Sequence, residues 1–240
     1  MNRTLESKIA VVTGGSGAIG SAIIAGLEQQ GARAVSLDVA RPAAGTAPFQ
    51  ACDVRDDGSV AAAIAEVQHI YGRLDLVVHA AGVSREAVVW KLAVEDWDFV
   101  QSVNLRGAFL LLRHAIPVMR TGEGGRIVLI GSINGSRGKF GTSAYSASKA
   151  GLIALARTVA REVARLGILI NVVEPGWVRT PLTDGLPQAV RDAALAESLV
   201  GKYVEPADVA AAVTFLCGPG AQQITGQILR VDGGQSLGSV

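Results

Sequence analysis

The sequence has 240 residues and a formal net charge of +1, with no basic tract. This length fits one α/β domain with a substantial core, and the charge argues against nucleic acid as a partner. Hydrophobic residues make up 49% of the chain and aromatic residues only 5%, which predicts an aliphatic core and excludes a disordered chain.

Strand-like and helix-like segments alternate along the whole chain. Short apolar runs predict buried strands at Ile9–Thr13, Ala34–Asp38, Phe49–Asp53, Leu74–His79, Arg126–Gly131, Ile168–Val173 and Gln227–Val231. Helical spacing predicts helices at Ile19–Gln30, Asp57–Tyr71, Trp97–Met119, Ser146–Leu166 and Pro206–Leu216. This alternation predicts a single α/β domain over residues 1–240, a doubly wound parallel sheet of Rossmann type with helices on both faces.

The stretch from Gly176 to Glu205 interrupts the alternation after a predicted strand. One short helix is predicted inside it, at Gln188–Glu197. Long insertions at the carboxyl ends of strands often cover a substrate, so we expect residues 176–205 to form a lid.

A glycine-rich loop lies between the first strand and the first helix, where positions 13–20 read T-G-G-S-G-A-I-G. Glycines let the backbone approach a pyrophosphate, and the following helix N-terminus favours its negative charge. An ordinary glycine-rich turn is the alternative, but the place after the first strand favours a dinucleotide. The expected cofactor-binding residues of this loop are Gly14, Ser16, Ala18, Ile19 and Gly20.

Two acidic residues end the next two strands. Asp38 can accept hydrogen bonds from the adenosine ribose hydroxyls and repels a 2′-phosphate, which favours NAD(H) over NADP(H). Arg41 is the nearby cation that could offset this repulsion. Asp53 either meets the adenine amino group or caps the turn that follows it.

Tyr145 and Lys149 lie four residues apart in Y-S-A-S-K, just before the predicted helix Ser146–Leu166. Residues at this spacing share one face of a helix, so an ammonium group can lie close to the phenol. A nearby cation lowers a phenol pKa from its usual value of about 10. Such a tyrosine can exchange a proton with an alcohol or carbonyl oxygen near neutral pH.

Further short motifs follow one another along the chain. They are H-A-A-G at 79–82, N-x-x-G at 104–107, a serine at 132, P-G at 175–176 and V-D-G-G at 231–234. With the glycine loop and the tyrosine–lysine pair, they resemble the short-chain dehydrogenase/reductase family over essentially the whole chain. Two positions depart from the family pattern: Ala18 replaces a loop glycine, and Ala80 replaces an asparagine that braces the turn.

The resemblance implies a catalytic set of Asn104, Ser132, Tyr145 and Lys149. Tyr145 would be the general acid in reduction and the base in oxidation, with Ser132 holding the substrate oxygen. Lys149 would lower the pKa of the tyrosine and bind the nicotinamide ribose, and Asn104 would hold a water that links Lys149 to solvent. The plainer interpretations are a turn serine at 132 and, at 104, a helix-interior asparagine bonded to a carbonyl.

The resemblance also implies a wider set of cofactor contacts. Besides the loop residues and Asp38, these are Asp53, Val54, Ala80, Ala81, Gly82, Tyr145, Lys149, Pro175, Gly176, Val178 and Thr180. The hydride passes directly between cofactor and substrate, so no metal is expected.

The predicted function is NAD(H)-dependent interconversion of a secondary alcohol and a ketone, with a small-molecule alcohol or ketone as the partner. Within the family, the chain also resembles 3-oxoacyl-acyl-carrier-protein reductases, which usually take NADPH, and dihydrodiol dehydrogenases. A non-catalytic dinucleotide-binding protein is the rival from a different class, because fold alone does not give function.

Several other residues have two interpretations. Trp90 and Trp97 are predicted to be packing residues, whereas Trp177, which directly follows the P-G pair, could touch the substrate. Glu174 is either a hydrogen-bonded structural group or a wall of the pocket.

Compartment and assembly are predicted from weaker signals. Cys52 and Cys217 lie in apolar surroundings, which favours buried thiols in a reducing compartment. Without a recognisable signal peptide or a membrane-length apolar span, the prediction is a cytoplasmic protein without membrane contact. The family resemblance implies a homotetramer or a dimer.

Overall fold

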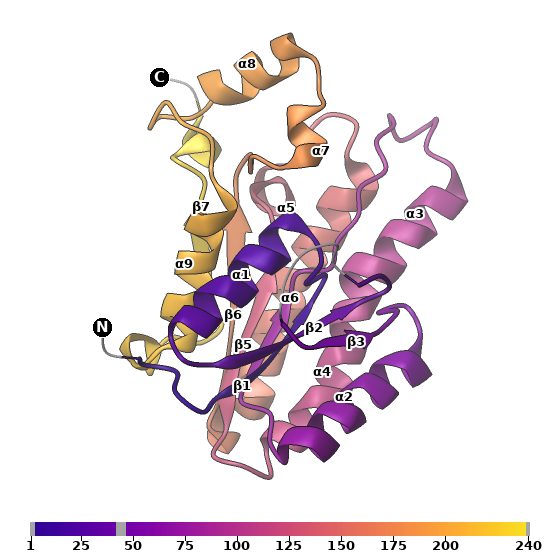
Figure 1. The fold of residues 1–240 in the computed structure, drawn as a ribbon. Helices are drawn as coiled ribbons and strands as arrows, with labels where there is room; N and C mark the ends of the chain where they lie inside the picture. Colours follow the sequence, from indigo (N-terminus) through magenta and orange to yellow (C-terminus); the bar gives the residue numbers. More distant parts are fainter. Residues whose placement is uncertain (1–2, 42–46, 239–240) are drawn as a thin grey trace.

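The computed structural model describes residues 3–41 and 47–238, and Figure 1 shows their arrangement. Within these residues, seven strands form one parallel sheet in the order β3-β2-β1-β4-β5-β6-β7. The strands are β1 Ile9–Thr13, β2 Arg33–Asp38, β3 Phe49–Ala51, β4 Leu76–His79, β5 Gly125–Ile130, β6 Ile168–Pro175 and β7 Ile228–Val231. The predicted doubly wound α/β fold is confirmed. The strand order reverses between β1 and β4, and ligands of such sheets bind in the crevice at that point.

Helices cover both faces of the sheet. One face carries α1 (Ala18–Gln29) and α9 (Pro206–Cys217). The other face carries α2 (Asp57–Tyr71), α4 (Gly107–Met119) and α6 (Ser143–Val163). Alternate residues of β1 face the two layers, because side chains of a strand point to opposite faces in turn.

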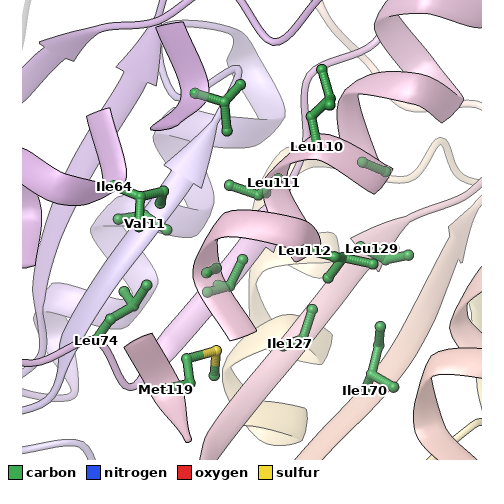
Figure 2. Packing of buried hydrophobic residues seen from close by; sticks show 14 of the residues in the cluster. Val11, Ile64, Leu74, Leu110, Leu111, Leu112, Met119, Ile127, Leu129 and Ile170 are labelled. Atoms are coloured by element: carbon green, nitrogen blue, oxygen red, sulfur yellow. The ribbon is translucent and has the colours of Figure 1, made fainter. Parts of the chain in front are cut away.

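The core is aliphatic, as the composition predicts. Figure 2 shows part of the layer under α2 and α4, where Val11, Leu111 and Ile127 are fully buried. Met119, also fully buried, ends α4 in the same layer. Dense packing of this kind fixes the strands, so the loops at their carboxyl ends start from fixed positions.

The predicted long helix Trp97–Met119 is interrupted in the structure. It consists of α3 (Val94–Gln101), a π-helical turn η1 (Ser102–Arg106) and then α4. A π turn contains one extra residue compared with an α turn and occurs frequently at functional sites. Asn104, a predicted site residue, lies in the middle of this turn and is fully buried.

Several boundaries differ from the prediction. Helix α6 begins at Ser143, so Tyr145 lies in its first turn instead of just before it. The helix α5 (Ile133–Arg137), which directly follows Ser132, was not predicted.

The segment 176–205 contains α7 (Pro181–Asp184) and α8 (Gln188–Ala196), of which only α8 was predicted. Figure 1 shows these two helices at the top of the view, above β7 and α5. The short helices η2 (Ala164–Leu166), η3 (Pro219–Ala221) and η4 (Gln235–Leu237) complete the described elements. In the part of the chain that the structure describes, no helix combines the length and apolar character that a membrane crossing requires.

Candidate active site

The glycine loop after β1 packs against the segment after β4. Gly14 has φ +65°, and a Cβ atom there would lie 2.7 Å from the Cα atom of Ala81. A Cβ atom at Gly20 would overlap the carbonyl oxygen of Gly14. Both positions therefore need glycine, because the loop packs closely on itself and on Ala81. Ala18 and Ile19 begin α1 directly after the loop, and the N–H groups of a helix N-terminus in this position can bind a pyrophosphate.

Asp38 lies next to this loop. Its Oδ2 accepts a hydrogen bond from the backbone N–H of Ser16 at 3.1 Å, and its Oδ1 accepts one from Val39 at 2.8 Å. The guanidinium group of Arg41 stacks on the ring of Phe49, 4.9 Å from its centroid. Arg41, the cation that could offset the charge of Asp38, thus packs on Phe49.

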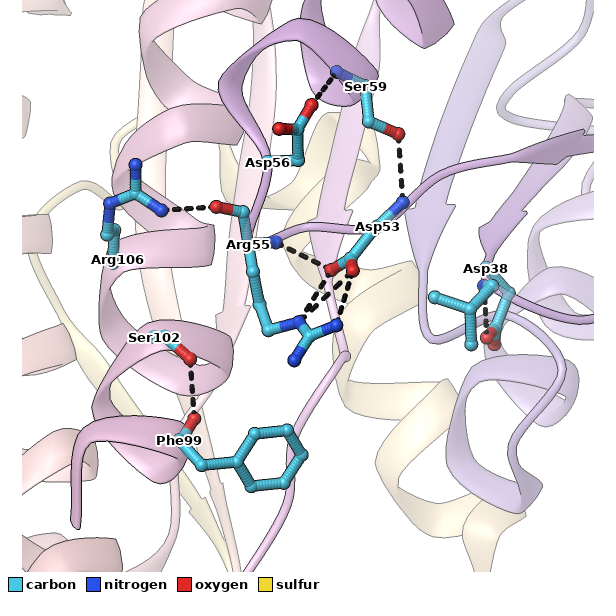
Figure 3. Close-up of polar contacts among 9 residues, drawn as sticks. Asp38, Asp53, Arg55, Asp56, Ser59, Phe99, Ser102 and Arg106 are labelled. Atoms are coloured by element: carbon cyan, nitrogen blue, oxygen red, sulfur yellow. Dashed lines mark hydrogen bonds and ion pairs between the residues drawn. The ribbon is translucent and has the colours of Figure 1, made fainter. Parts of the chain in front are cut away.

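Asp53 is bound by its own neighbour, as Figure 3 shows. Its carboxylate accepts hydrogen bonds from the backbone N–H of Arg55 at 2.9 Å and from the Arg55 guanidinium at 2.6 Å. These bonds from Arg55 hold the pKa of Asp53 below its usual value. Asp53 thus caps the turn that follows it, one of its two predicted roles. Val54, which follows it, is buried against Gly107.

Thr13 and Asn104 brace the turn after β4 that lacks the family's asparagine at position 80. The backbone N–H of Ala80 donates to the Thr13 carbonyl at 3.1 Å, and that of Ala81 donates to the Thr13 hydroxyl at 3.3 Å. The Asn104 amide pairs with both backbone groups of Val83, at 2.8 Å and 3.0 Å. The predicted cofactor-binding residues at 80–82 are thus held between β1 and the π turn.

His79 lies completely buried behind this turn. Its Nδ1 lies 2.9 Å from the Thr13 hydroxyl and its Nε2 lies 3.2 Å from the Asn104 carbonyl oxygen. Burial, with the nearby charge of Lys149, lowers the pKa of His79 to about 3, so the ring is neutral. A neutral ring with its proton on Nε2 satisfies both partners, because the carbonyl can only accept. This role of His79 was not predicted, and its sequence signal is a histidine at the start of H-A-A-G.

Lys149 and Tyr145 lie together, as their spacing predicts. The Lys149 Nζ is 5.7 Å from the centroid of the Tyr145 ring and donates a hydrogen bond to the Ile130 carbonyl at 2.8 Å. A Cβ atom at Gly82 would lie 3.4 Å from the same Nζ. Burial lowers the pKa of Lys149 to about 8. Contacts therefore lead from the glycine loop through the segment at 81–82 to Lys149.

The pKa of Tyr145 shifts in the direction opposite to the prediction. Burial raises it, a hydrogen bond with Ser132 lowers it in part, and the charge of Glu86 raises it further. The predicted net lowering of the Tyr145 pKa is therefore wrong, because burial of the phenol outweighs any lowering by the nearby cation of Lys149, which is itself directed to the Ile130 carbonyl. The phenol therefore keeps its proton at neutral pH.

Ser132 and Asn104 both connect to the tyrosine. Ser132 caps α5 by accepting from the backbone N–H of Asn134 at 3.2 Å, and its hydroxyl also reaches Tyr145. Asn104 donates to the hydroxyl of Ser148 at 2.9 Å, and Ser148 donates to the Tyr145 carbonyl at 2.7 Å. Ser148 was not predicted, although it lies within Y-S-A-S-K.

The segment after β6 follows the edge of the same site. Pro175 ends β6, and the Gly176 N–H donates to the carbonyl of Val231 at 3.0 Å. Val178 pairs with Val204, and Thr180 caps α7 by accepting from the Thr183 N–H at 3.3 Å. The predicted residues at 175–180 thus lie at the carboxyl end of β6.

Glu174 is a hydrogen-bonded structural group. It is fully buried, its Oε1 accepts from the Ser136 hydroxyl at 2.8 Å, and its Oε2 pairs with Arg230 at 3.2 Å. These contacts join β6, β7 and α5, and they resolve the choice that the sequence left open.

Two cavities lie near the first turn of α6 and in the lid segment. The first measures about 300 Å³ and is lined by Ala87, Val88, Val89, Trp90, Gly138, Lys139, Phe140, Gly141, Ser143 and Ser146. The second measures about 180 Å³ and is lined by Trp177, Arg179, Asp184, Gln188, Arg191 and Tyr203. The Lys139 ammonium lies 5.1 Å from the centroid of the Trp177 ring.

Trp90 and Trp97 are not buried packing residues. Trp90 is 77% exposed and Trp97 is 38% exposed, so this prediction is wrong. Trp90 instead lines the first cavity, beside Ser146.

Comparisons with known proteins identify the family of the chain. A family model described as enoyl-(acyl carrier protein) reductase matches residues 14–236. A 3-oxoacyl-[acyl-carrier-protein] reductase of Thermotoga maritima is 33% identical, covering 96% of this chain and 98% of the relative. An acetoacetyl-CoA reductase of Synechocystis is 38% identical, covering 95% of this chain and 96% of the relative.

A solved structure gives the same result. The ligand-free aldohexose dehydrogenase of Thermoplasma acidophilum superposes with a TM-score of 0.92 at 29% identity, covering 99% of this chain and 97% of that one. Fold, ordered motifs and relatives agree over the whole length. The chain is an oxidoreductase of alcohols and ketones, and it belongs to the short-chain dehydrogenase/reductase family, whose members use NAD(P)H.

Proposed function

We propose that the protein is an NAD(H)-dependent oxidoreductase that interconverts a secondary alcohol and a ketone. The observation that carries this proposal is the set of contacts from the glycine loop to the tyrosine. Gly14 packs on Ala81, Gly82 packs on Lys149, and Lys149 lies over Tyr145. A cofactor that spans these loops therefore ends beside a proton donor.

The side chains around the glycine loop support NAD(H). Asp38 lies beside the loop backbone, where its charge opposes a 2′-phosphate, and Arg41 stacks on Phe49. The proposed cofactor-binding residues are Gly14, Ser16, Ala18, Ile19, Gly20, Asp38, Asp53, Val54, Ala80, Ala81, Gly82, Tyr145, Lys149, Pro175, Gly176, Val178 and Thr180. The bound nicotinamide supplies or accepts the hydride, which needs no metal.

The proposed chemistry of the chain itself is proton transfer at the substrate oxygen. The raised pKa of Tyr145 keeps its phenol protonated near neutral pH, which suits a proton donor in ketone reduction. Ser132 reaches the same phenol, so its hydroxyl can hold the substrate oxygen there. Lys149 places a cation behind the ring that favours the phenolate once the proton has left.

Asn104 braces the site through its hydrogen bonds. Its side-chain amide forms hydrogen bonds with Val83 and Ser148, and its backbone carbonyl oxygen pairs with His79. The carbonyl has a second lone pair, which we propose as the acceptor for a water that relays protons from Lys149.

A 3-oxoacyl thioester is the second candidate substrate. The names of several relatives, including a (3R)-3-hydroxyacyl-CoA dehydrogenase of dog at 38% identity, share this 3-oxoacyl or 3-hydroxyacyl chemistry. The cavity lined by Val88, Trp90 and Phe140 supports an apolar substrate body. A dihydrodiol remains the alternative within the family.

The proposal extends to organisation and compartment. We propose one domain over residues 1–240 with a substrate lid at 176–205, whose two helices stand at the carboxyl end of β6. Two buried free cysteines support a reducing compartment, the cytoplasm. Phe109 on α4 is 48% exposed, which supports pairing of α4 across a two-fold axis in a homotetramer or dimer.

Replacement of the tyrosine tests the proposal. Tyr145→Phe should lower turnover roughly 10²-fold or more, because general acid–base catalysis supplies about that factor, while NADH binding persists. Tyr71→Phe, in α2 against Arg33, is the matched control and should keep wild-type turnover. Near-normal turnover of Tyr145→Phe rejects the assignment. Intact NADH binding without turnover of any alcohol or ketone by the wild type favours the non-catalytic rival.

A further inference from the structure

Helix α5 is held in place by residues from distant parts of the chain. Arg137, the last residue of α5, forms an ion pair with Glu197 at 2.8 Å and donates to the carbonyl of Gln235 at 3.1 Å. Glu197 directly follows α8 in the lid segment, and Gln235 begins η4. Ser132 caps the other end of α5, so the same short helix joins the catalytic serine to the lid.

Gln235 binds the lid at two places, near its start and at the end of α8. Its side chain is almost completely buried, and its Oε1 accepts from the backbone N–H of Trp177 at 2.8 Å. Its Nε2 donates to Oε2 of Glu197 at 2.9 Å, the oxygen that also binds Arg137. Trp177 is the second residue of the segment 176–205, and Glu197 directly follows α8. The start of the lid and the end of α8 therefore meet at one amide.

We propose that Arg137, Glu197 and Gln235 form a latch that couples closure of the lid to the position of Ser132. The inference rests on the proposed function, since it concerns the placement of that site's serine. Arg137, Glu197 and Gln235 are positioning residues, because they act on the site through α5 and Trp177.

Both elements joined by the latch are weak on their own. Helix α5 has five residues, too few to be stable without tertiary contacts. Of the described side chains between 176 and 205, only Val178, Ala194 and Val204 are buried. Segments with so few buried apolar groups open locally at low free energy. The polar contacts of the latch therefore contribute much of what holds α5 and the lid in place.

The electrostatics favour a charged latch. Burial alone raises the pKa of Glu197, but hydrogen bonds from Gln235 and Arg137 bring it below its usual value. Lys139, which lies on the Trp177 ring, acts in the same direction. The carboxylate is ionised at neutral pH, and one oxygen binds a guanidinium and an amide, a charge-assisted arrangement.

The matched variants are Glu197→Gln and Asp192→Asn. Glu197→Gln removes a negative charge just after α8, and Asp192→Asn removes one in the middle of that helix. Among the described residues, Asp192 accepts a side-chain hydrogen bond from Gln188 within α8 and none from α5 or η4. Hydrogen exchange of residues 132–137 is the main readout, and it needs no substrate. Turnover and KM with the best ketone found for the wild type are the second.

We expect Glu197→Gln to raise exchange across residues 132–137 and to lower turnover by roughly three- to tenfold, since partly exposed ion pairs and their couplings have this size. Asp192→Asn should change neither. The charge-exchanged double variant Arg137→Glu/Glu197→Arg should recover part of both losses. If Glu197 only stabilised the lid, Glu197→Gln would raise hydrogen exchange at residues 176–205 and leave residues 132–137 unchanged.

Three results would overturn the latch. They are unchanged exchange at 132–137 in Glu197→Gln, the same change in Asp192→Asn, and no recovery in the double variant. A wild type that turns over no alcohol or ketone rejects the proposed function instead, and the exchange data then decide the coupling of the lid to α5 by themselves.

Discussion

The centre of the site and the lid are built in opposite ways. Around Lys149, the side chains of His79, Asn104 and Ser148 are buried and bond to backbone carbonyls or to one another. In the lid, the ion pairs lie at the surface, as between Arg179 and Asp184 at 3.5 Å.

The difference has an energetic meaning. A buried donor or acceptor that loses its partner finds no water to replace it, so every bond of the centre matters. An exposed ion pair exchanges its partner for water at little cost. The centre can therefore fix one reaction geometry, while the lid can open and can vary with the substrate. The Arg137–Glu197 pair joins the two regions.

The largest expected effect is the pH dependence of the two reaction directions. Because the pKa of Tyr145 is raised, the phenol predominates from pH 6 to 8 and the phenolate fraction grows with pH. Oxidation, which needs the phenolate, should accelerate by roughly tenfold per pH unit, whereas reduction should stay nearly constant. The slope for oxidation should fall above pH 8, where Lys149, with a pKa of about 8, loses its charge.

Steady-state rates in both directions between pH 6 and 9 measure this asymmetry. Residual oxidation by Tyr145→Phe is the control and should lose the slope. An oxidation rate that is flat from pH 6 to 8 in the wild type contradicts the role given to the raised pKa.

The next effect concerns the buried centre. Asn104→Ala removes the partner of both backbone groups of Val83 and of Ser148. An unsatisfied buried group costs about 1–3 kcal/mol, so the free energy of unfolding should fall by at least that amount. Turnover should fall about tenfold or more, because the turn at 80–83 and the first turn of α6 lose their connection.

Asn171→Ala is the matched control for this variant. Asn171 is also a buried amide, which donates to the Ile224 carbonyl at 2.8 Å and accepts from the Gln227 N–H at 3.0 Å, outside the proposed site. Denaturant titration should show a similar loss of stability in both variants. Equal turnover in the two folded variants would show that Asn104 only supports the fold.

The fold and the outline of the site could be predicted because they depend on local pattern. The alternation of strands and helices gives the parallel sheet, and the loops at the carboxyl ends of its strands follow from it. The four-residue spacing of Tyr145 and Lys149 places them on one helix face regardless of the rest of the chain.

The missed features depend on contacts between distant residues. Nothing in Ser102–Arg106 indicates a π turn, which brings Asn104 to His79 and Val83. The direction of the Tyr145 pKa shift depends on its burial, which spacing does not reveal. Arg137 and Glu197 are far apart in sequence and share no motif.

The smallest expected effect lies at the adenosine end, outside the buried centre. Asp38→Ala removes a half-buried carboxylate that contacts the loop at Ser16. A hydrogen bond to a charged group contributes about 1.5–3 kcal/mol, so KM for NADH should rise by roughly tenfold. KM for NADPH should fall, because a charge that opposes the 2′-phosphate is gone. Turnover at saturating cofactor should stay within about twofold of the wild type, since Tyr145 and Lys149 keep their contacts.

Asp57→Asn, which changes an exposed carboxylate beside His114, is the control. A wild type that already prefers NADPH would show that the charge of Asp38 does not select the cofactor, and the proposed NAD(H) preference would then be withdrawn while the proton-transfer chemistry would stand.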